Sequence, residues 1–334
     1  RRGQANEEFH NMGTTCSVLT ILPEGAVCAH IGDSRIYRLT QNRIEQLTFD
    51  HSLVWEMKFA GQLSEEEERL GKIPKNVITR SLGPYAECNV DLEGPFPIQV
   101  GDTFLLCSDG LTAVISDTEI GSILANMSPD EAVKVLVDLS NLRGGPDNIT
   151  AVIVKIGHPK LATSGNHSSG KSSRYSSSNK PLVPATFWGG FIGSAIVTIL
   201  LYFLGFWQIS LLTGVVSLAA VGYLVSRLIK NSFQGKHGGT GEVFGKGPYV
   251  RLGCASSGQF AKQLADMLRK LQEGALRENW KVDWPQLKSM TGKAEQATSQ
   301  EDHSTAIANY GRAVSFLMDQ LRNQEDASSS SIEL

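Results

Sequence analysis

The stretch from Asp102 to Thr112 is the feature that most constrains how this 334-residue chain can fold. Its middle is a short apolar run rich in strand formers and bounded by turn residues, which predicts a buried strand. The strand ends in Ser108-Asp109-Gly110. A carboxylate delivered at a strand end, followed by a glycine that allows close backbone approach, is typical of a metal ligand. The same Asp-Gly pair also fits an ordinary turn.

A second copy of this arrangement favours the metal interpretation. Gly144-Gly145-Pro146-Asp147-Asn148 is a turn sequence that places Asp147 just before a predicted strand at 149–156. Two carboxylates at two strand ends can share hard cations, because Mg²⁺ and Mn²⁺ prefer carboxylate and water oxygens.

Charge and cysteine content exclude other classes of function. The net charge of -3 leaves no basic footprint, so nucleic acid is not an expected partner. The five cysteines are scattered, without CxxC or zinc-type spacing, and Cys16, Cys28 and Cys107 lie in apolar runs. We interpret these three as small core residues of a protein in a reducing compartment.

The first 157 residues have an antiparallel rather than a βαβ pattern. Strands are expected at 16–22, 26–31, 36–39 and 44–47, a strand-like run at 77–83, and helices at 53–63, 117–126 and 129–142. Gly32-Asp33-Ser34-Arg35 fits either a plain turn or part of a site. Ser64 is expected to cap a helix that opens with four solvated glutamates, and His51 is expected to be structural or exposed rather than a ligand.

Six short motifs in a fixed order carry a resemblance to a known family. They are Met12-Gly13-Thr14-Thr15, Gly32-Asp33-Ser34-Arg35, Leu47-Thr48-Phe49-Asp50-His51, Asn76 to Gly83, Ser108-Asp109-Gly110 and Asp147-Asn148-Ile149-Thr150. In this order they resemble the metal-dependent PP2C (PPM) protein phosphatases of the bacterial type, over roughly residues 5–157. The resemblance implies an α+β fold, a four-layered α/β/β/α sandwich of two antiparallel sheets with metal ions in the cleft between them.

The resemblance also implies roles for individual residues. Asp109 and Asp147 would be ligands of a centre that holds two Mn²⁺ or Mg²⁺ ions, and Asp50 would hold a third, weaker ion. The supporting residues would be Gly110, Asn148, Asp33 and Ser34. Residues from Ser52 to Lys75 would form the flap beside the cleft that tunes substrate choice. A two-metal site activates water and clamps phosphoryl oxygens, so no nucleophilic side chain is expected.

The chain departs from the family pattern in two respects. Ala113 lies where members commonly have an acid, and no Asp-Gly-x-Gly-Gly motif precedes Gly13. We therefore expect a phosphatase domain at 1–157 that lacks its N-terminal strands, and negligible activity from the chain as given.

Beyond residue 157 the composition changes abruptly. A Ser/Gly-rich linker is expected at 158–185. No charged residue occurs between Phe187 and Ser226, which is long enough for two membrane spans of about 20 residues each. Both flanks are basic, so we expect a transmembrane hairpin at 186–229 with both ends in the cytoplasm. A buried soluble hairpin is the alternative.

A Gly-rich linker is expected at 230–253, followed by a helical tail at 254–326 and a disordered end at 327–334. The apolar stripe Phe260, Leu264, Met267, Leu268 and Leu271 indicates one amphipathic helix, and Trp284-Pro285 and Thr305 begin two more. The stretch 294–314 is faintly similar to a tetratricopeptide hairpin, but a three-helix bundle or partner-docking helices fit better.

The sequence thus predicts a membrane-tethered serine/threonine phosphatase whose catalytic domain and tail are cytoplasmic. Its partners would be phosphoproteins, the substrates of serine/threonine kinases, and the tail would bind a protein. The alternative is a decayed phosphatase-like scaffold that binds signalling partners at the membrane.

Overall fold

The computed structural model describes residues 12–64, 66–67, 73–74, 77–85, 87–163 and 243–329. All of these lie within one compact unit, made of residues 1–164 and 243–334. The expected transmembrane hairpin at 186–229 lies outside the described residues. Within the described ranges, no helix is both long and apolar enough to cross a bilayer.

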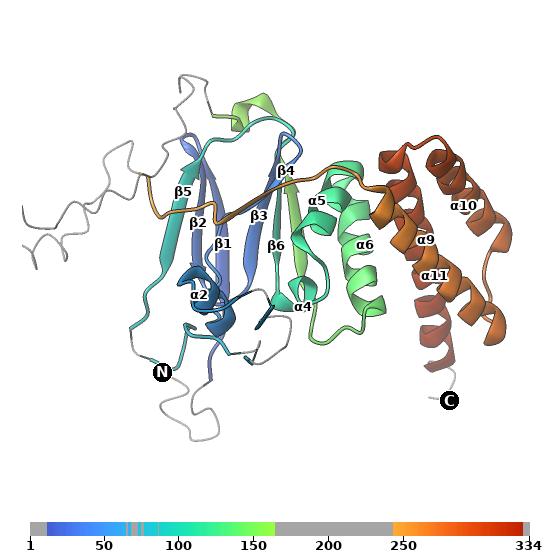
Figure 1. Cartoon of the computed structure of the whole chain (residues 1–334), viewed down its shortest axis with the longest axis horizontal. Coiled ribbons are helices and arrows are strands. Elements are labelled where there is room, and N and C mark those ends of the chain that lie inside the picture. The colour runs from blue at the N-terminus through green and yellow to red at the C-terminus, as the bar shows by residue number, and fades with distance from the viewer. Residues whose placement is uncertain are drawn as a thin grey trace, which may run out of the picture. The chain divides into compact units, whose positions relative to one another are not determined.

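One of the two sheets is antiparallel and has three strands (Figure 1). Its strands are β1 (Cys16–Leu22), β2 (Gly25–Ile31) and β5 (Asp91–Phe96), in the order β1-β2-β5. β1 and β2 form a tight hairpin in which Leu22 pairs with Gly25. Gly25 has a φ of +141°, a backbone conformation that L side chains rarely adopt. β5 was not expected, because Gly94 and Pro95 interrupt its apolar pattern.

A five-stranded antiparallel sheet has the order β7-β6-β3-β4-β8. Its strands are β3 (Arg35–Thr40), β4 (Arg43–Gln46), β6 (Thr103–Cys107), β7 (Ala151–Lys155) and β8 (Val250–Gly253). The predicted hairpin between β3 and β4 is confirmed, and its turn residues Gln41 and Asn42 both have positive φ. The expectation of two antiparallel sheets is therefore confirmed.

Successive side chains of a strand point to opposite faces of its sheet, and the buried residues accordingly form two core layers. One layer lies between the sheets and is made by Ala26, Cys28, Ile36, Leu47, Phe96, Ile98, Phe104 and Ile156. The other lies against the opposite face of the five-stranded sheet, where Tyr37, Leu39, Leu105 and Cys107 face helices α5 (Asp117–Asn126) and α6 (Pro129–Leu142). The predicted inward residues of α6 are all buried: Ala132, Val135, Leu136 and Leu139.

Capping boxes explain where α5 and α6 begin. Ser116 Oγ donates to the Glu119 carboxylate at 2.8 Å, and Ser128 Oγ donates to Glu131 at 3.0 Å. In each box the glutamate also accepts from the backbone N–H of the capping serine. A shorter helix, α4 (Asp109–Thr112), directly follows β6, so Asp109 lies at a helix start as well as at a strand end.

The helical tail packs against α5 and α6 (Figure 1). Its helices are α9 (Gly258–Arg277), α10 (Trp284–Ser299) and α11 (His303–Ser329), and their buried residues continue the core of α5 and α6. Arg312 pairs with Glu131 of α6 at 2.8 Å, and Arg322 pairs with Asp138 at 2.9 Å. Residues 250–253, which we expected to lie in a linker, form β8 because Arg43 to Gln46 offer them an open strand edge.

Three further expectations need correction. Cys16, expected in the core, is exposed on the outer face of β1, whereas Cys28 and Cys107 are buried as expected. The strand-like run at 77–83 forms no strand in the described residues, because its ends bridge different partners: Ile78 pairs with Ser52 and Leu82 with Thr14. The outer face of β1, with Val18 and Leu22, is exposed. Of the four expected layers, the described residues therefore form the two sheets and the helices over the five-stranded sheet.

Candidate active site

The two Asp motifs meet where β6 ends and β7 begins. The Ser108 N–H donates to the Thr150 carbonyl at 3.0 Å, and the Thr150 N–H donates to Ser108 Oγ at 2.9 Å. Ser108 Oγ also donates to the Asn148 carbonyl at 3.0 Å. These bonds bring the turn that carries Asp147 against the residue that precedes Asp109.

Gly110 shows how close this approach is. A Cβ added at Gly110 would lie 2.6 Å from the Asn148 carbonyl oxygen and 3.1 Å from that of Asp147. Any side chain here would push the 147–148 backbone away from Asp109. The close approach of the two turns therefore depends on the absence of a side chain at Gly110.

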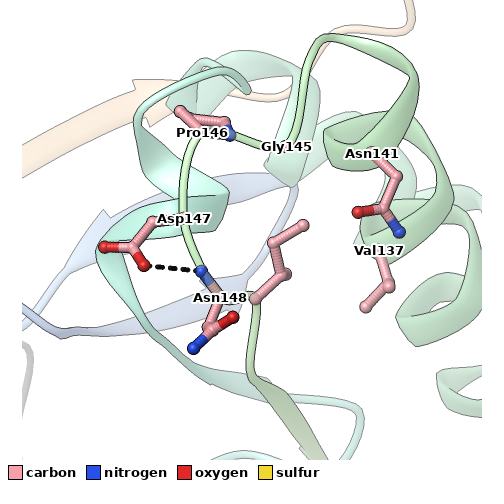
Figure 2. Close-up of a pocket in the computed structure, with 7 residues that line it drawn as sticks. Val137, Asn141, Gly145, Pro146, Asp147 and Asn148 are labelled. Carbon is pink, nitrogen blue, oxygen red and sulfur yellow. Dashed lines mark hydrogen bonds between the residues drawn. The ribbon is translucent and has the colours of Figure 1, made fainter.

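Asp147 and Asn148 line an open pocket of about 490 Å³ beside α6. Figure 2 shows the Asp147 carboxylate pointing away from Val137 and Asn141 on α6. Its Oδ1 accepts the Asn148 N–H at 2.7 Å. This short bond orients the carboxylate through Oδ1, and Oδ2 could then bind a cation.

Asp33 lies in the turn between β2 and β3 and is electrostatically coupled to Asp109. Burial raises the pKa of Asp33 to about 6, with the negative charges of Asp109 and Asp50 adding to the shift. Ser34, next to it, shares a hydrogen bond with Thr15 at 2.9 Å. The Gly13-Thr14-Thr15 and Gly32-Asp33-Ser34-Arg35 motifs therefore meet at one end of the sheets.

Asp50 is engaged by Arg35, a contact that the sequence analysis did not foresee. The Arg35 Nε and Nη2 atoms donate to Asp50 Oδ2 at 3.0 and 2.8 Å. Asp50 is 4% exposed, and its Oδ1 has no hydrogen-bond partner among the described residues. One oxygen of this carboxylate is thus neutralised by an arginine, and the other is available to a donor or a cation. Arg35 is the last residue of the Gly32-Asp33-Ser34-Arg35 motif, so its membership of that motif could have indicated that it lies near the site.

His51 is structural, in line with expectation. Its Nδ1 accepts the Gly32 N–H at 3.0 Å, and its Nε2 bonds Asp91 at 2.9 Å. Asp91 in turn accepts from Arg80 at 2.9 Å. Because both ring nitrogens are occupied, His51 orients the Gly32 turn and leaves no lone pair for a metal ion.

The donor chemistry fits a hard divalent cation, but the described residues do not complete a shell. Carboxylates are the ligands that Mg²⁺ and Mn²⁺ prefer. In the part of the chain that the structure describes, no three His, Cys, Asp or Glu side chains are grouped closely enough to hold an ion. Ala113, at the end of α4, contributes only a backbone N–H, which bonds the Asp109 carbonyl at 2.8 Å.

The expected flap begins with helix α2 (Leu53–Phe59), which is shorter than predicted. Ser52 caps it by accepting the Trp55 N–H at 3.4 Å. The predicted cap at Ser64 is confirmed, since Ser64 Oγ accepts the Glu67 N–H at 3.3 Å and the Glu67 carboxylate accepts the Ser64 N–H at 3.0 Å. Lys75, the far end of the expected flap, lies outside the described residues.

Comparison with known proteins gives a consistent set of relatives. The family model for protein phosphatase 2C matches residues 1–56. A putative PP2C-type phosphatase of Streptococcus pyogenes is 43% identical over 150 residues, which cover 45% of this chain and 60% of the relative. The protein phosphatase PhpP of Streptococcus pneumoniae is 43% identical over 152 residues, covering 45% and 61%. The serine/threonine phosphatase stp of Listeria welshimeri is 39% identical over 153 residues, covering 46% and 60%.

Solved structures give similar coverage. The serine/threonine phosphatase of S. agalactiae is 38% identical, covers 45% of this chain and 62% of its own, and has a TM-score of 0.41. The Mycobacterium tuberculosis phosphatase PstP/Ppp is 31% identical, covers 47% and 66%, and has a TM-score of 0.44. The chain spans about three fifths of the length of the curated relatives it matches. The part of the chain that the family model and the sequence relatives match is therefore similar to PP2C-type protein phosphatases.

Proposed function

We propose that the protein is a metal-dependent serine/threonine protein phosphatase. The observation that carries this proposal is the contact between the two Asp motifs, in which Gly110 lets the backbone of Asp147 and Asn148 approach Asp109. The sequence relatives named as serine/threonine phosphatases support it.

Each residue of the site then has a defined task. Asp109 and Asp147 would hold Mn²⁺ or Mg²⁺, which when bound supplies an acidified water and neutralises phosphate charge. Asp50 would hold a third ion weakly through Oδ1, because Arg35 already occupies Oδ2. Asp33 adds negative charge beside Asp109, and Ser34 and Asn148 hold the two turns in place.

We also propose that the protein is tethered to the membrane by the uncharged segment at 187–226, with its catalytic domain and tail in the cytoplasm. This rests on the sequence alone: a span of about 20 apolar residues suffices for one crossing, and basic residues flank both ends. Its substrates would be proteins that serine/threonine kinases have phosphorylated.

One observation favours a second candidate, a phosphatase-like scaffold without catalysis. No group of three metal-ligand side chains is found in the described ranges. A domain that binds phosphoproteins without hydrolysing them needs no metal shell, and would hold its partners at the membrane.

Hydrolysis of a phosphothreonine peptide by the whole protein separates the two candidates. A phosphatase releases phosphate with Mn²⁺ present and stops when the ion is chelated. A scaffold binds the peptide equally well in both conditions and releases no phosphate.

A further inference from the structure

The segment from Val243 to Tyr249, here called the strap, ties the two sheets together just before β8. It begins against the three-stranded sheet, where the Gly94 N–H donates to the Phe244 carbonyl at 3.1 Å. It ends against the five-stranded sheet, where the Tyr249 N–H donates to the Gln46 carbonyl at 2.8 Å. Figure 1 shows this orange segment passing from the side of β5 towards α9.

Glu93 of β5 anchors the strap. Its carboxylate accepts the Gly247 N–H at 2.8 Å and the hydroxyl of Tyr249. Glu93 is 2% exposed, and a Cβ added at Gly245 would collide with its carboxylate. A buried carboxylate with such partners holds the backbone and the Tyr249 ring in one place.

The anchored Tyr249 ring contacts the flap helix α2. Its ring centroid lies 5.2 Å from that of Phe49 and 6.2 Å from that of Phe59, and the Phe49 and Phe59 centroids are 5.3 Å apart. All three pairs are edge-to-face, an arrangement that aromatic rings favour. Phe59 is the last residue of α2, so the strap supports the end of the helix that leads into the flap.

Phe49, one of these three rings, also links α2 to the candidate metal centre. Phe49 directly precedes Asp50, and its ring lies 6.3 Å from that of Trp55 on α2. The Arg35 guanidinium lies 5.2 Å from the Trp55 ring and pairs with Asp50 at 2.8 Å. A shift of α2 would therefore disturb the ring that Arg35 contacts, and Arg35 in turn holds Asp50.

We infer that Tyr249 is a positioning residue, through which the C-terminal part of the chain sets the placement of α2 beside the catalytic site. The expected effect of Tyr249 on substrate binding rests on the proposed function, whereas its effect on the placement of α2 does not. Tyr249 touches no reacting group and acts through Phe49 and Phe59.

Hydrogen exchange of the full chain tests the placement without any activity. Tyr249→Ala removes the ring, and Tyr249→Phe keeps the ring while losing the bond to Glu93. In Tyr249→Ala, exchange should rise about tenfold at the Glu56 amide of α2 and at the Ala60 and Gln62 amides, which bond α2 carbonyls from just beyond its end, while β6 stays protected. In Tyr249→Phe it should change by less than about threefold, and Val243→Ala, at a 79% exposed strap position, should not change it. Unchanged α2 exchange in Tyr249→Ala overturns the inference, and so does an equal rise in β6.

A kinetic readout on the whole protein then addresses substrate. Tyr249→Ala should raise the KM for a phosphothreonine peptide by about fivefold or more, and leave kcat for p-nitrophenyl phosphate within about twofold. A parallel fall in kcat for both substrates would assign Tyr249 to folding and not to positioning. If the wild-type protein hydrolyses neither substrate, the proposed function fails, and the exchange result still decides whether Tyr249 holds α2.

Discussion

The imidazole rings of His30 and His51 stack with their centroids 5.1 Å apart, and both rings are fully buried. His30 Nδ1 bonds Ser17 at 2.9 Å, and its Nε2 bonds the Gly32 carbonyl at 2.8 Å. Burial lowers the pKa of His30 to about 4, and the neighbouring His51 adds to the shift. The hydrogen bond to the Gly32 carbonyl and the negative charges of Asp50 and Asp91 oppose this lowering of the pKa only in part.

This arrangement predicts an acid-sensitive fold. The folded-state pKa of His30 lies below its unfolded value, so the unfolded chain takes up the proton first as pH falls. Stability that is fully present above about pH 6.5 should be lost between pH 6.5 and 4, by up to about 3 kcal/mol. Urea unfolding of wild type and His30→Gln across this range measures it. The variant should show a shallower slope, and parallel slopes would contradict the assignment.

The close approach at Gly110 predicts a second effect. Gly110→Ala should force the 147–148 backbone away from Asp109, at a cost of about 1–3 kcal/mol, because the new Cβ would meet a carbonyl oxygen at 2.6 Å. Gly274→Ala is the matched control, since Gly274 lies within α9 with nothing within 4 Å of its added Cβ. It should stabilise the protein by about 0.5–1 kcal/mol. Thermal unfolding measures the change in stability of both variants. Equal changes in the melting temperature would contradict the close contact between the two motifs.

Removing a proposed ligand predicts loss of metal and of activity together. In the whole protein, Asp109→Asn or Asp147→Asn should cut Mn²⁺-dependent hydrolysis of a phosphopeptide by several orders of magnitude, because each removes a charged ligand. Titration calorimetry should show weaker Mn²⁺ binding in the same variants. Asp266→Asn, at an exposed site on α9, is the control. Near-normal activity in either ligand variant would refute the assignment.

Much of this architecture follows from local sequence signals. Strand pairs such as β1–β2 and β3–β4 could be predicted, since alternating apolar residues flank Gly or Asn turns. The helix starts at Ser116 and Ser128 follow from their capping residues. The two strand-end motifs suggested that Asp109 and Asp147 share a site, and in the structure the backbone of Asp147 and Asn148 lies close to Gly110.

The remaining features depend on partners distant in sequence. β8 is four residues long and forms only because β4 offers it a free edge. Nothing near Glu93 predicts that its carboxylate would accept from Tyr249, a residue of the strap. The pairing of Arg35 with Asp50 likewise requires two turns to meet in space. Such contacts have no periodicity and leave no local pattern to detect.

The docking of the tail predicts its own pH dependence. Hydrogen bonds from Arg312 lower the pKa of Glu131 to about 2. The pair therefore contributes stability above about pH 4.5 that is lost as pH falls towards 2. The effect should be about 0.5–1 kcal/mol, because the two side chains are 39% and 37% exposed. Wild type should lose more thermal stability over this range than Glu131→Gln. Asp266→Asn, whose partner Arg269 lies on the same helix, should behave as wild type.

The last prediction concerns the uncharged segment at 187–226, which lies outside the described residues. A charged residue within a span costs about 2.5–3.5 kcal/mol on insertion scales, so the absence of any charge favours two antiparallel crossings. The segment should turn near Trp207-Gln208 on the outer side, leaving the flanks at Ser169 and Gly239 inside. An impermeant thiol reagent applied to intact cells can decide, in a background where the exposed Cys16 and Cys88 are replaced by serine. A cysteine at Gln208 should react, and cysteines at Ser169 and Gly239 should not. Labelling at Gly239 but not at Ser169 would mean a single crossing, which would place the α9–α11 tail and the strands of the two sheets on opposite sides of the membrane. Since those elements share one core, that outcome would also contradict the packing of the tail against α5 and α6.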